Sequence, residues 1–318
     1  MGMKWADMLR PIVCLAPMDG ITDSAYRQLV RRFNRDVVLF SEFTSADGFL
    51  RSEKVRGRLD FAAEEHPYFV QLFGNNPASF AEASRALEQA GVAGIDINMG
   101  CPAKKIVASQ HGSGLMRDVD RACRIVEAVA GACGLEVSVK TRLGWTDSTG
   151  LLDFARALVG AGASLIAVHG RTYDQAFKGA ADWAPIHDLK RQLAVPVLGN
   201  GDVESLADGR AKMGNLDGFM IGRAAIGNPW VFHPAASAAP LTMAGRVSVI
   251  REHYSLMCRL KDRPRALVEF RKHLSGYLRG VSHIKSMRGA LMTAPDEGAF
   301  LRLLDALESC EAPIAQAS

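Results

Sequence analysis

The chain has 318 residues, a mass of 34.3 kDa and a formal net charge of +4. Hydrophobic residues make up 48% of it and charged residues 23%, which is ordinary for a folded protein and argues against a mainly disordered chain. The length excludes a small disulfide-stapled module and suffices for one large α/β domain with an appended segment.

Short β-branched runs alternate with Ala- and Leu-rich amphipathic stretches over residues 1–225. The expected strands, in chain order, are Ile12–Ala16, Val37–Phe43, Tyr68–Phe73, Gly94–Asn98, Glu136–Thr141, Leu165–His169, Pro196–Gly199 and Gly218–Ile221. The helical stretches between them include Pro77–Ala90, Asp120–Ala132, Leu151–Ala161 and Val203–Lys212. Eight such units predict a (β/α)8 TIM barrel of parallel strands. A doubly wound sheet is the alternative, but the first turn, Ala16-Pro17-Met18-Asp19-Gly20, lacks the glycine fingerprint that such a sheet carries.

The composition changes after Trp230. Residues 231–245 are rich in Ala and Pro and indicate a linker, and the pattern from there to Cys310 is helical without a clear strand. We therefore expect a catalytic barrel domain over residues 1–235 and a C-terminal helical domain over residues 246–318.

The C-terminal segment carries most of the positive charge. Between Arg246 and Arg288, eleven Lys or Arg residues stand against three Asp or Glu residues, a net charge of +8. This excess predicts a segment that binds a polyanion, and the alternative is an ordinary solvated helix face.

The cysteines and the apolar runs exclude several classes of protein. The six cysteines (Cys14, Cys101, Cys123, Cys133, Cys258 and Cys310) form no CxxC pair and no Cys/His cluster with metal-ligand spacing, so we expect no metal. No signal peptide and no apolar run long enough to span a membrane are visible, so we expect a cytoplasmic protein with reduced thiols.

Polar and glycine residues follow the end of nearly every expected strand. In a (β/α)8 barrel the loops after the strands converge on one rim, where the active site lies. In chain order these residues are Pro17, Met18, Gln71, Asn98, Cys101, Lys140, Arg142, His169, Arg171, Asn200, Gly201, Asp202, Gly222 and Arg223. A purely structural barrel would not need them, so this rim is the predicted active site.

Two of these strand ends predict a phosphate site. Loops after the seventh and eighth strands often hold phosphate, because glycine lets backbone N–H groups approach. Asn200-Gly201 and Gly222-Arg223 fit this role, and Lys140 supplies a cation nearby. A flavin mononucleotide (FMN) would need such parts, together with an amide such as Gln71. Met18 could lie against the flavin ring, although core packing is the alternative for that residue.

Cys101 lies in Gly100-Cys101-Pro102, directly after a strand. The proline keeps a helix from starting at the cysteine. A thiol at the barrel mouth can act as a nucleophile or as a general acid, since its ordinary pKa lies slightly above neutrality. The other five cysteines fall in apolar or helical contexts.

Together these motifs resemble the tRNA-dihydrouridine synthases, and Cys-Pro-Ala-Lys-Lys is most similar to their bacterial B-type branch. The motifs are Leu15–Gly20, Gln71–Gly74, Asn98–Lys105, Val139–Trp145, Val168–Thr172, Gly199–Asp202 and Ile221–Arg223. The resemblance covers the whole barrel in the expected order. Two segments depart from the pattern: Ile106–His111 replaces more basic or small residues, and Phe177 stands where a tyrosine is expected.

The resemblance implies an FMN enzyme that uses NADPH or NADH to reduce the C5–C6 double bond of specific D-loop uridines in tRNA. It implies that Cys101 protonates C5 and that hydride from FMN reaches C6. Asn98 would contact the uracil, and Arg142 and Arg171 would help to hold the substrate or the site. The residues implied to bind FMN are Pro17, Met18, Gln71, Lys140, His169, Asn200, Gly201, Asp202, Gly222 and Arg223.

The basic helical domain would then place the tRNA through contacts to its phosphates. We expect the patch Arg271-Lys272-His273 to contribute most, with Arg279, Lys285 and Arg288 as weaker candidates. A monomer suffices for this function.

Two other functions stay open from the sequence. The first is an FMN barrel that acts on a free pyrimidine, which would leave the +8 segment and the cysteine motif unexplained. The second is a tRNA-binding protein without catalysis, which would not need Cys101, Lys140 and His169. The sequence also leaves open which uridine is reduced and whether NADPH or NADH is the reductant.

Overall fold

The computed structural model describes residues 3–235, 242–282 and 284–309. The chain divides into two compact units, which are described separately below. The first comprises Met1–Asp19 and Asp36–Gly222, and the second comprises Gly20–Arg35 and Arg223–Ser318.

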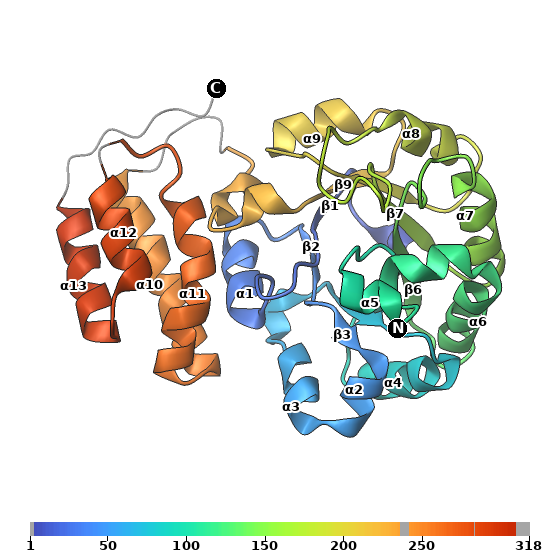
Figure 1. Cartoon of the computed structure of the whole chain (residues 1–318), viewed down its shortest axis with the longest axis horizontal. Coiled ribbons are helices and arrows are strands. Elements are labelled where there is room, and N and C mark those ends of the chain that lie inside the picture. Colours follow the sequence, from blue (N-terminus) through green and yellow to red (C-terminus); the bar gives the residue numbers. More distant parts are fainter. Residues whose placement is uncertain (1–2, 236–241, 283, 310–318) are drawn as a thin grey trace. The chain divides into compact units, whose positions relative to one another are not determined.

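The first unit is a closed barrel of eight parallel strands (Figure 1). Each strand pairs in parallel with its two neighbours, and β9 pairs with β1 to close the ring. A short ninth strand, β3 (Thr44–Ser45), adds to the edge of β4. The barrel strands are β1 (Ile12–Leu15), β2 (Val38–Phe40), β4 (Tyr68–Phe73), β5 (Gly94–Asn98), β6 (Glu136–Arg142), β7 (Leu165–His169), β8 (Val197–Asn200) and β9 (Gly218–Ile221).

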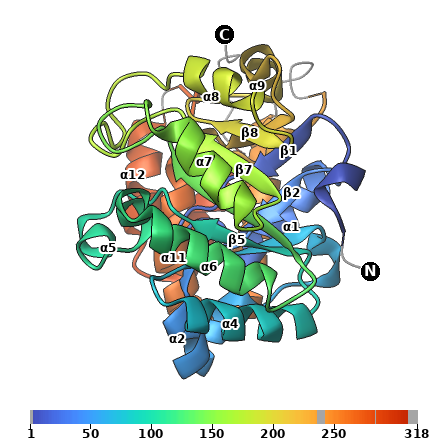
Figure 2. The same cartoon turned by 90° about the vertical axis from the view of Figure 1, so that its right-hand side faces the viewer.

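Helices cover the outside of the barrel, and Figure 2 shows α6 and α7 in front of the strands. The helices of this unit are α2 (Ala46–Arg51), α3 (Glu53–Arg56), α4 (Pro77–Gln89), α5 (Lys104–Ala108), α6 (Val119–Ala130), α7 (Leu151–Gly160), α8 (Ala184–Lys190) and α9 (Leu206–Met213). Side-chain caps fix several helix starts: Asn76 accepts from Ala78 N, and Asp118 accepts from Arg121 N.

The barrel interior is apolar away from the carboxyl ends of its strands. Trp5 stacks on Phe69 with ring centroids 4.3 Å apart, and both are buried. Small side chains such as Cys14 and Ala167 fill the space around them, so this part is a packed core. Polar side chains replace the apolar ones at the carboxyl ends of the strands.

The second unit is helical. It contains α1 (Ser24–Phe33), α10 (Met243–Leu260), α11 (Arg263–Tyr277), α12 (Lys285–Thr293) and α13 (Glu297–Glu308). In Figure 1 the last four helices run side by side, and α1 packs on α10. Gly276 lies where α11 meets the Ile226-Gly227 backbone, and a Cβ there would come within 1.7 Å of the Ile226 carbonyl oxygen. Glycine therefore permits this close approach.

The (β/α)8 fold expected from the sequence is confirmed, and all eight expected strands are present with ends shifted by a few residues. The largest change is in the expected strand Val37–Phe43, which stops at Phe40. The strand stops there because the Ser41 hydroxyl donates to the Glu42 carbonyl and, in place of a backbone carbonyl, accepts a hydrogen bond from Gln71 N. The compact units also differ from the expected domain limits, since α1 groups with the C-terminal helices.

The expected linker, residues 231–245, lies in part outside the described residues, as does Cys310. The short helix η6 (Pro229–Phe232) begins this region, and α10 begins at Met243. None of the helices that the structure describes is long and apolar enough to cross a membrane.

Candidate active site

The register of the barrel gathers the polar strand ends at the carboxyl end of the sheet. Gln71 on β4 pairs with Asp96 on β5, and Asn98 on β5 pairs with Lys140 on β6. Further round the barrel, Arg142 pairs with His169, and His169 pairs with Asn200. Side chains two residues apart on a strand share a face, so these groups line the carboxyl end of the barrel.

The turn that carries Cys101 is shaped by the side chain of Asn98. The Asn98 Oδ1 atom accepts hydrogen bonds from the backbone N–H of Gly100 at 3.1 Å and of Cys101 at 2.9 Å. The Cys101 carbonyl accepts from Ser113 N at 3.2 Å. Both sides of the turn are therefore held, which places the half-buried thiol at the end of β5.

A chain of buried polar side chains supports Asn98 from inside the barrel. Asn98 Nδ2 donates to Gln71 Oε1 at 2.8 Å, and Gln71 Nε2 donates to Asp96 Oδ2 at 2.6 Å. The hydroxyl of Ser138 donates to Asp96 Oδ1, also at 2.6 Å. Sequence reasoning missed Asp96 and Ser138. The available signal was an aspartate within an otherwise apolar strand, Gly94–Asn98.

Lys140 supplies a positive charge to the site. Its Nζ atom donates to Asn200 Oδ1 at 3.0 Å, and Asn200 Nδ2 in turn donates to the Met220 carbonyl at 3.0 Å. Burial, assisted by the charge of Arg142, lowers the pKa of Lys140 to about 8, while Asp96 acts in the opposite direction. Lys140 is therefore mostly protonated at neutral pH but can lose its proton in mild alkali.

Burial also acts on the Cys101 thiol and raises its pKa above the ordinary value. A hydrogen bond from the Ala103 backbone and the charges of Arg142 and Lys140 oppose this rise, but burial has the largest effect. The thiol therefore remains protonated at neutral pH, which suits a proton donor better than a nucleophile.

Arg142, the last residue of β6, ties two loops together. Its Nε atom donates to the Gly100 carbonyl at 2.7 Å, and its Nη1 atom donates to the carbonyls of Thr172 and Ala176 at 3.1 and 2.8 Å. The guanidinium also lies over the Phe177 ring, 5.5 Å from its centroid, and that ring is 57% exposed. Arg142 thus fixes the backbone beside Cys101 and connects it to the loop after β7.

The loop after β8 has a backbone that favours glycine. Gly201 has φ +123°, and a Cβ there would approach the Ala181 Cβ atom to 2.7 Å and the His169 Nε2 atom to 3.6 Å. Asp202 follows with φ +49° and pairs with Arg171, whose Nη2 atom lies 2.6 Å from its carboxylate. The Nη1 atom of this buried arginine has no hydrogen-bond partner among the residues that the structure describes.

Four further candidates lie near the closing strands of the barrel. Pro17 and Met18 follow β1 and are half-buried. A Cβ on Gly222 would lie 3.9 Å from the Met18 sulfur, so the backbone of Gly222 passes close to this side chain. Arg223 is the next residue in the chain and begins the second unit in the short helix η5 (Arg223–Ala225).

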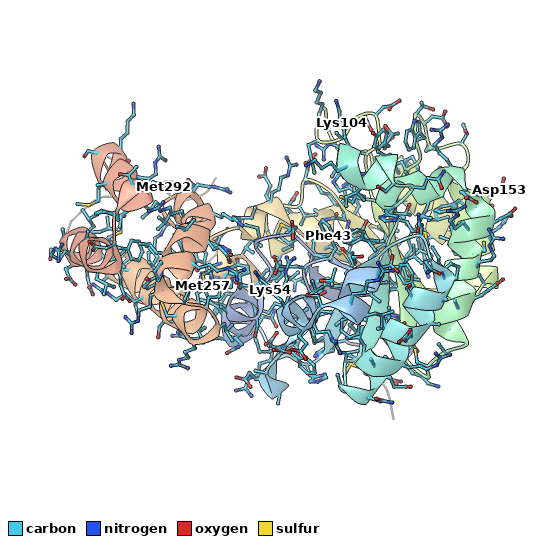
Figure 3. All side chains as sticks on the ribbon, turned by 60° about the horizontal axis from the view of Figure 1, so that its bottom comes forward. Phe43, Lys54, Lys104, Asp153, Met257 and Met292 are labelled. Atoms are coloured by element: carbon cyan, nitrogen blue, oxygen red, sulfur yellow. The ribbon has the colours of Figure 1, made fainter. Side chains whose placement is uncertain are left out.

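The barrel surface beside Cys101 carries exposed cations. Lys104 and Lys105 begin α5, and Figure 3 shows Lys104 projecting away from the ribbon. Arg117 lies over the Trp145 ring at 4.8 Å, and Trp145 stacks on Tyr173 with ring centroids 3.9 Å apart. The segment Ile106–His111, which departs from the expected motif, forms the rest of α5 and the turn after it.

In the helical unit the expected basic patch is only partly at the surface. Lys272 is exposed, and its Nζ atom donates to the Gly20 carbonyl at 3.3 Å. Arg271 is half-buried and donates from Nη2 to the Ala294 carbonyl at 2.8 Å. His273 is 1% exposed, so its expected place in a surface patch was wrong. Arg279, Lys285 and Arg288 are exposed.

The comparison with known proteins agrees with this arrangement. A sequence model described as dihydrouridine synthase (Dus) matches residues 14–311. A probable tRNA-dihydrouridine synthase of Rhodobacter capsulatus is 36% identical over 93% of this chain and 94% of its own length. The chain belongs to the dihydrouridine synthase family. The resemblance expected from the motifs is therefore confirmed, and the polar rim described above belongs to an oxidoreductase.

Other members of the dihydrouridine synthase family match over a similar span. A tRNA-dihydrouridine synthase B of Xanthomonas campestris is 37% identical over 93% of this chain and 92% of its own length. Among solved structures, an old yellow enzyme homologue of Zymomonas mobilis is similar, with a TM-score of 0.54 and 14% identity over 76% of this chain and 94% of its own length. At that identity the likeness shows the shared barrel fold.

Proposed function

We propose that this protein reduces the C5–C6 double bond of specific uridines in the D loop of tRNA to 5,6-dihydrouridine. FMN is the proposed cofactor and NADPH or NADH the proposed reductant, and the protein would act as a cytoplasmic monomer. The observation that carries the proposal is the half-buried thiol of Cys101 on a turn beside the cations Lys140 and Arg142, in a chain of the dihydrouridine synthase family.

The donor set at the barrel mouth fits FMN. Gly201 has a left-handed backbone without room for a side chain, which suits close approach of a phosphate to backbone N–H groups. Lys140 supplies a positive charge and Gln71 an amide. We assign FMN binding to Pro17, Met18, Gln71, Lys140, His169, Asn200, Gly201, Asp202, Gly222 and Arg223. When bound, FMN supplies the hydride that adds to C6 of the uracil.

Cys101 provides the proton for C5. Addition of hydride at C6 leaves negative charge at C5 and the adjacent carbonyl, and an acid must neutralise it. Burial keeps the Cys101 thiol protonated, and the charges of Lys140 and Arg142 favour the thiolate that remains after proton transfer. Asn98 would hold the uracil, and Arg142 and Arg171 would hold the loops that surround it.

The target uridine must leave the folded tRNA to reach this site, as bases do in other enzymes that modify them. We assign phosphate contacts to Lys272 and to the exposed residues Arg279, Lys285 and Arg288 of the helical unit, with Arg271 supporting them. On the barrel, Lys104, Lys105 and Arg117 offer exposed cations beside Cys101, and none has an ion pair with a residue that the structure describes.

The deciding experiment incubates the purified protein with unmodified tRNA and either NADPH or NADH, and maps dihydrouridine by position. The visible flavin spectrum is recorded beforehand, and free uridine and orotate are run in parallel. We expect a yellow protein that reduces D-loop uridine only in tRNA. Reduction of the free pyrimidines without reaction on tRNA would instead indicate an enzyme of small molecules, and a colourless protein that binds tRNA would indicate a binding function without catalysis.

A further inference from the structure

We propose that Asp96 is a positioning residue that fixes the direction of the Gln71 and Asn98 side-chain amides, and through them the Cys101 turn and the polarity presented to the uracil. The inference rests on the proposed function. It concerns a buried carboxylate at the level of the site that the proposed mechanism leaves without a role. Asp96 is 0% exposed and lies at the centre of β5.

The direction of this hydrogen-bond chain follows from the chemistry of its inner end, the Asp96 carboxylate. An ionised carboxylate only accepts hydrogen bonds, whereas an amide has a donating and an accepting end. Asp96 therefore selects the nitrogen of Gln71, which turns the Gln71 oxygen toward Asn98. That oxygen selects the nitrogen of Asn98, so the Asn98 oxygen must face the Cys101 turn.

The outer end of the chain needs this direction. The backbone N–H groups of Gly100 and Cys101 both point at Asn98 Oδ1. If the two amides were reversed, the Asn98 NH2 group would face these two donors and neither would be satisfied. A partly buried donor without a partner destabilises the folded state, so reversal would distort the turn that carries the Cys101 thiol.

The same direction determines what the site offers to a bound ring. Each amide nitrogen has two protons, and the chain uses one from Gln71 and one from Asn98. Gln71 is fully buried, so the N–H that can face a bound ring is the second one of Asn98, which is 7% exposed. A donor there complements the C4 carbonyl oxygen of uracil and not the C4 amino group of cytosine. Asp96 would thus contribute to the choice of uridine over cytidine.

The charge of Asp96 has a separate effect on Lys140. Burial raises the pKa of Asp96 to about 6, while Ser138, Gln71 and Lys140 stabilise its ionised form. Asp96 in turn raises the pKa of Lys140 against the effects of burial and of Arg142. The thiols of Cys14 and Cys101 also face this group of charges. Removal of the Asp96 charge should therefore lower the pKa of Lys140 further.

The test uses the full-length FMN enzyme with Asp96→Leu, Asp96→Asn and the control Ser138→Ala. The Ser138→Ala change removes one donor to the same carboxylate and leaves the link to Gln71 in place. From pH 7.5 upward, we expect it to keep kcat within about twofold. Asp96→Leu should lower kcat by 100-fold or more with little change in KM for tRNA, because the protein still binds the tRNA but holds the Cys101 turn and the ring incorrectly.

Asp96→Asn keeps the size of the side chain and one acceptor, so it should fold even if Asp96→Leu does not. We expect kcat to fall about tenfold and the alkaline limb of its pH profile to move to lower pH, because Lys140 loses its neighbouring negative charge. As a readout independent of turnover, iodoacetamide should alkylate Cys101 at an altered rate in the apo forms of both Asp96 variants and not in Ser138→Ala.

The outcomes separate this inference from the proposed function. If the wild-type protein makes no dihydrouridine, the proposed function is wrong, whatever the variants do. If the wild-type protein is active and Asp96→Asn matches it in kcat, pH profile and Cys101 alkylation, Asp96 has no positioning role. An equal loss in Ser138→Ala and Asp96→Asn would also overturn the inference, since that loss would report core packing and not amide direction.

Discussion

Lys140 on β6 and Asn200 on β8 are joined by a hydrogen bond of 3.0 Å across the intervening strand β7. The bond aims the ammonium group of Lys140 along the rim, between the Cys101 turn and the glycine loop after β8. A cation in this place can stabilise negative charge on a bound ring, provided that it keeps its proton.

Activity should therefore depend on the protonation of Lys140. Because the pKa of Lys140 is about 8, we expect kcat for dihydrouridine formation to fall as pH rises through that value. Lys140→Met should lower kcat by about 100-fold or more, and its residual activity should lack this alkaline limb. Steady-state rates between pH 6 and 10 measure both effects. If Lys140→Met kept the alkaline fall in kcat, that fall would report the titration of another group.

Cys101→Ala should keep FMN and tRNA binding but lose uridine reduction. Removal of a general acid lowers rates by about 10²- to 10⁴-fold. The hydrogen bond that the Cys101 thiol accepts from the Ala103 backbone lies within the same turn, so its loss should leave the fold intact. Single-turnover formation of dihydrouridine by the reduced enzyme gives the rate directly. Near-normal turnover by Cys101→Ala, with its flavin spectrum intact, would exclude the thiol as the proton donor.

Gly201→Ala should weaken FMN binding. The backbone of Gly201 lies at φ +123°, which L residues rarely adopt, and the new Cβ would press on Ala181. Strain of about 1–3 kcal/mol at this loop corresponds to a loss of affinity of roughly 5- to 150-fold. Titration of the apo protein with FMN, followed by fluorescence, measures the change. Gly160→Ala is a matched control, since a Cβ at Gly160 meets nothing within 4 Å.

The barrel and most rim residues could be predicted from the sequence because each strand end carries its own local signal. The hydrogen-bond chain from Asp96 to Cys101 could not be predicted, since it depends on the register that pairs Gln71 with Asp96 and Asn98 with Lys140. The sequence shows which residues follow each strand. It does not show which end of a side-chain amide faces its neighbour, and that direction is set by the buried carboxylate.

His273 shows the same limit in the helical unit. The run Arg271-Lys272-His273 reads as a basic cluster, but a helix turns by about 100° per residue, so adjacent residues face different directions. Lys272 is exposed, Arg271 supports the backbone at Ala294, and His273 is buried against Tyr26 with ring centroids 4.9 Å apart. Within this run, charge composition predicted an exposed position correctly only for Lys272.

Lys272 and Arg271 should therefore respond differently to alanine substitution. Lys272→Ala should weaken tRNA binding and reduce the salt slope of the binding constant by about one unit, which is the loss of one phosphate contact. Arg271→Ala should mainly lower the thermal stability of the protein, because the Ala294 carbonyl loses its donor. Filter binding at several salt concentrations and thermal melts separate the two. A salt-independent loss in Lys272→Ala would contradict the phosphate contact.

Acid should destabilise the helical unit through His273. Burial lowers the pKa of His273 to about 4, although Asp23 acts in the opposite direction and Lys272 and Lys261 add to the lowering. An unfolded histidine has a pKa near 6.5, so the unfolded state binds more protons between these two values and stability falls as pH drops through this window. The difference between the folded and unfolded pKa values of His273 corresponds to a loss of roughly 3 kcal/mol of stability, and this loss is complete below pH 4.

His273→Phe should move the acid unfolding midpoint to lower pH, because it keeps an aromatic ring against Tyr26 and removes the titrating group. His253 packs on His273 with ring centroids 4.6 Å apart and also has a lowered pKa, so part of the acid sensitivity should remain. Helical circular dichroism followed from pH 7 to pH 3 measures the midpoint. The exposed His233 is the matched control, and His233→Phe should leave the midpoint in place. If His273→Phe unfolds at the same pH as the wild type, the protonation of His273 does not limit acid stability.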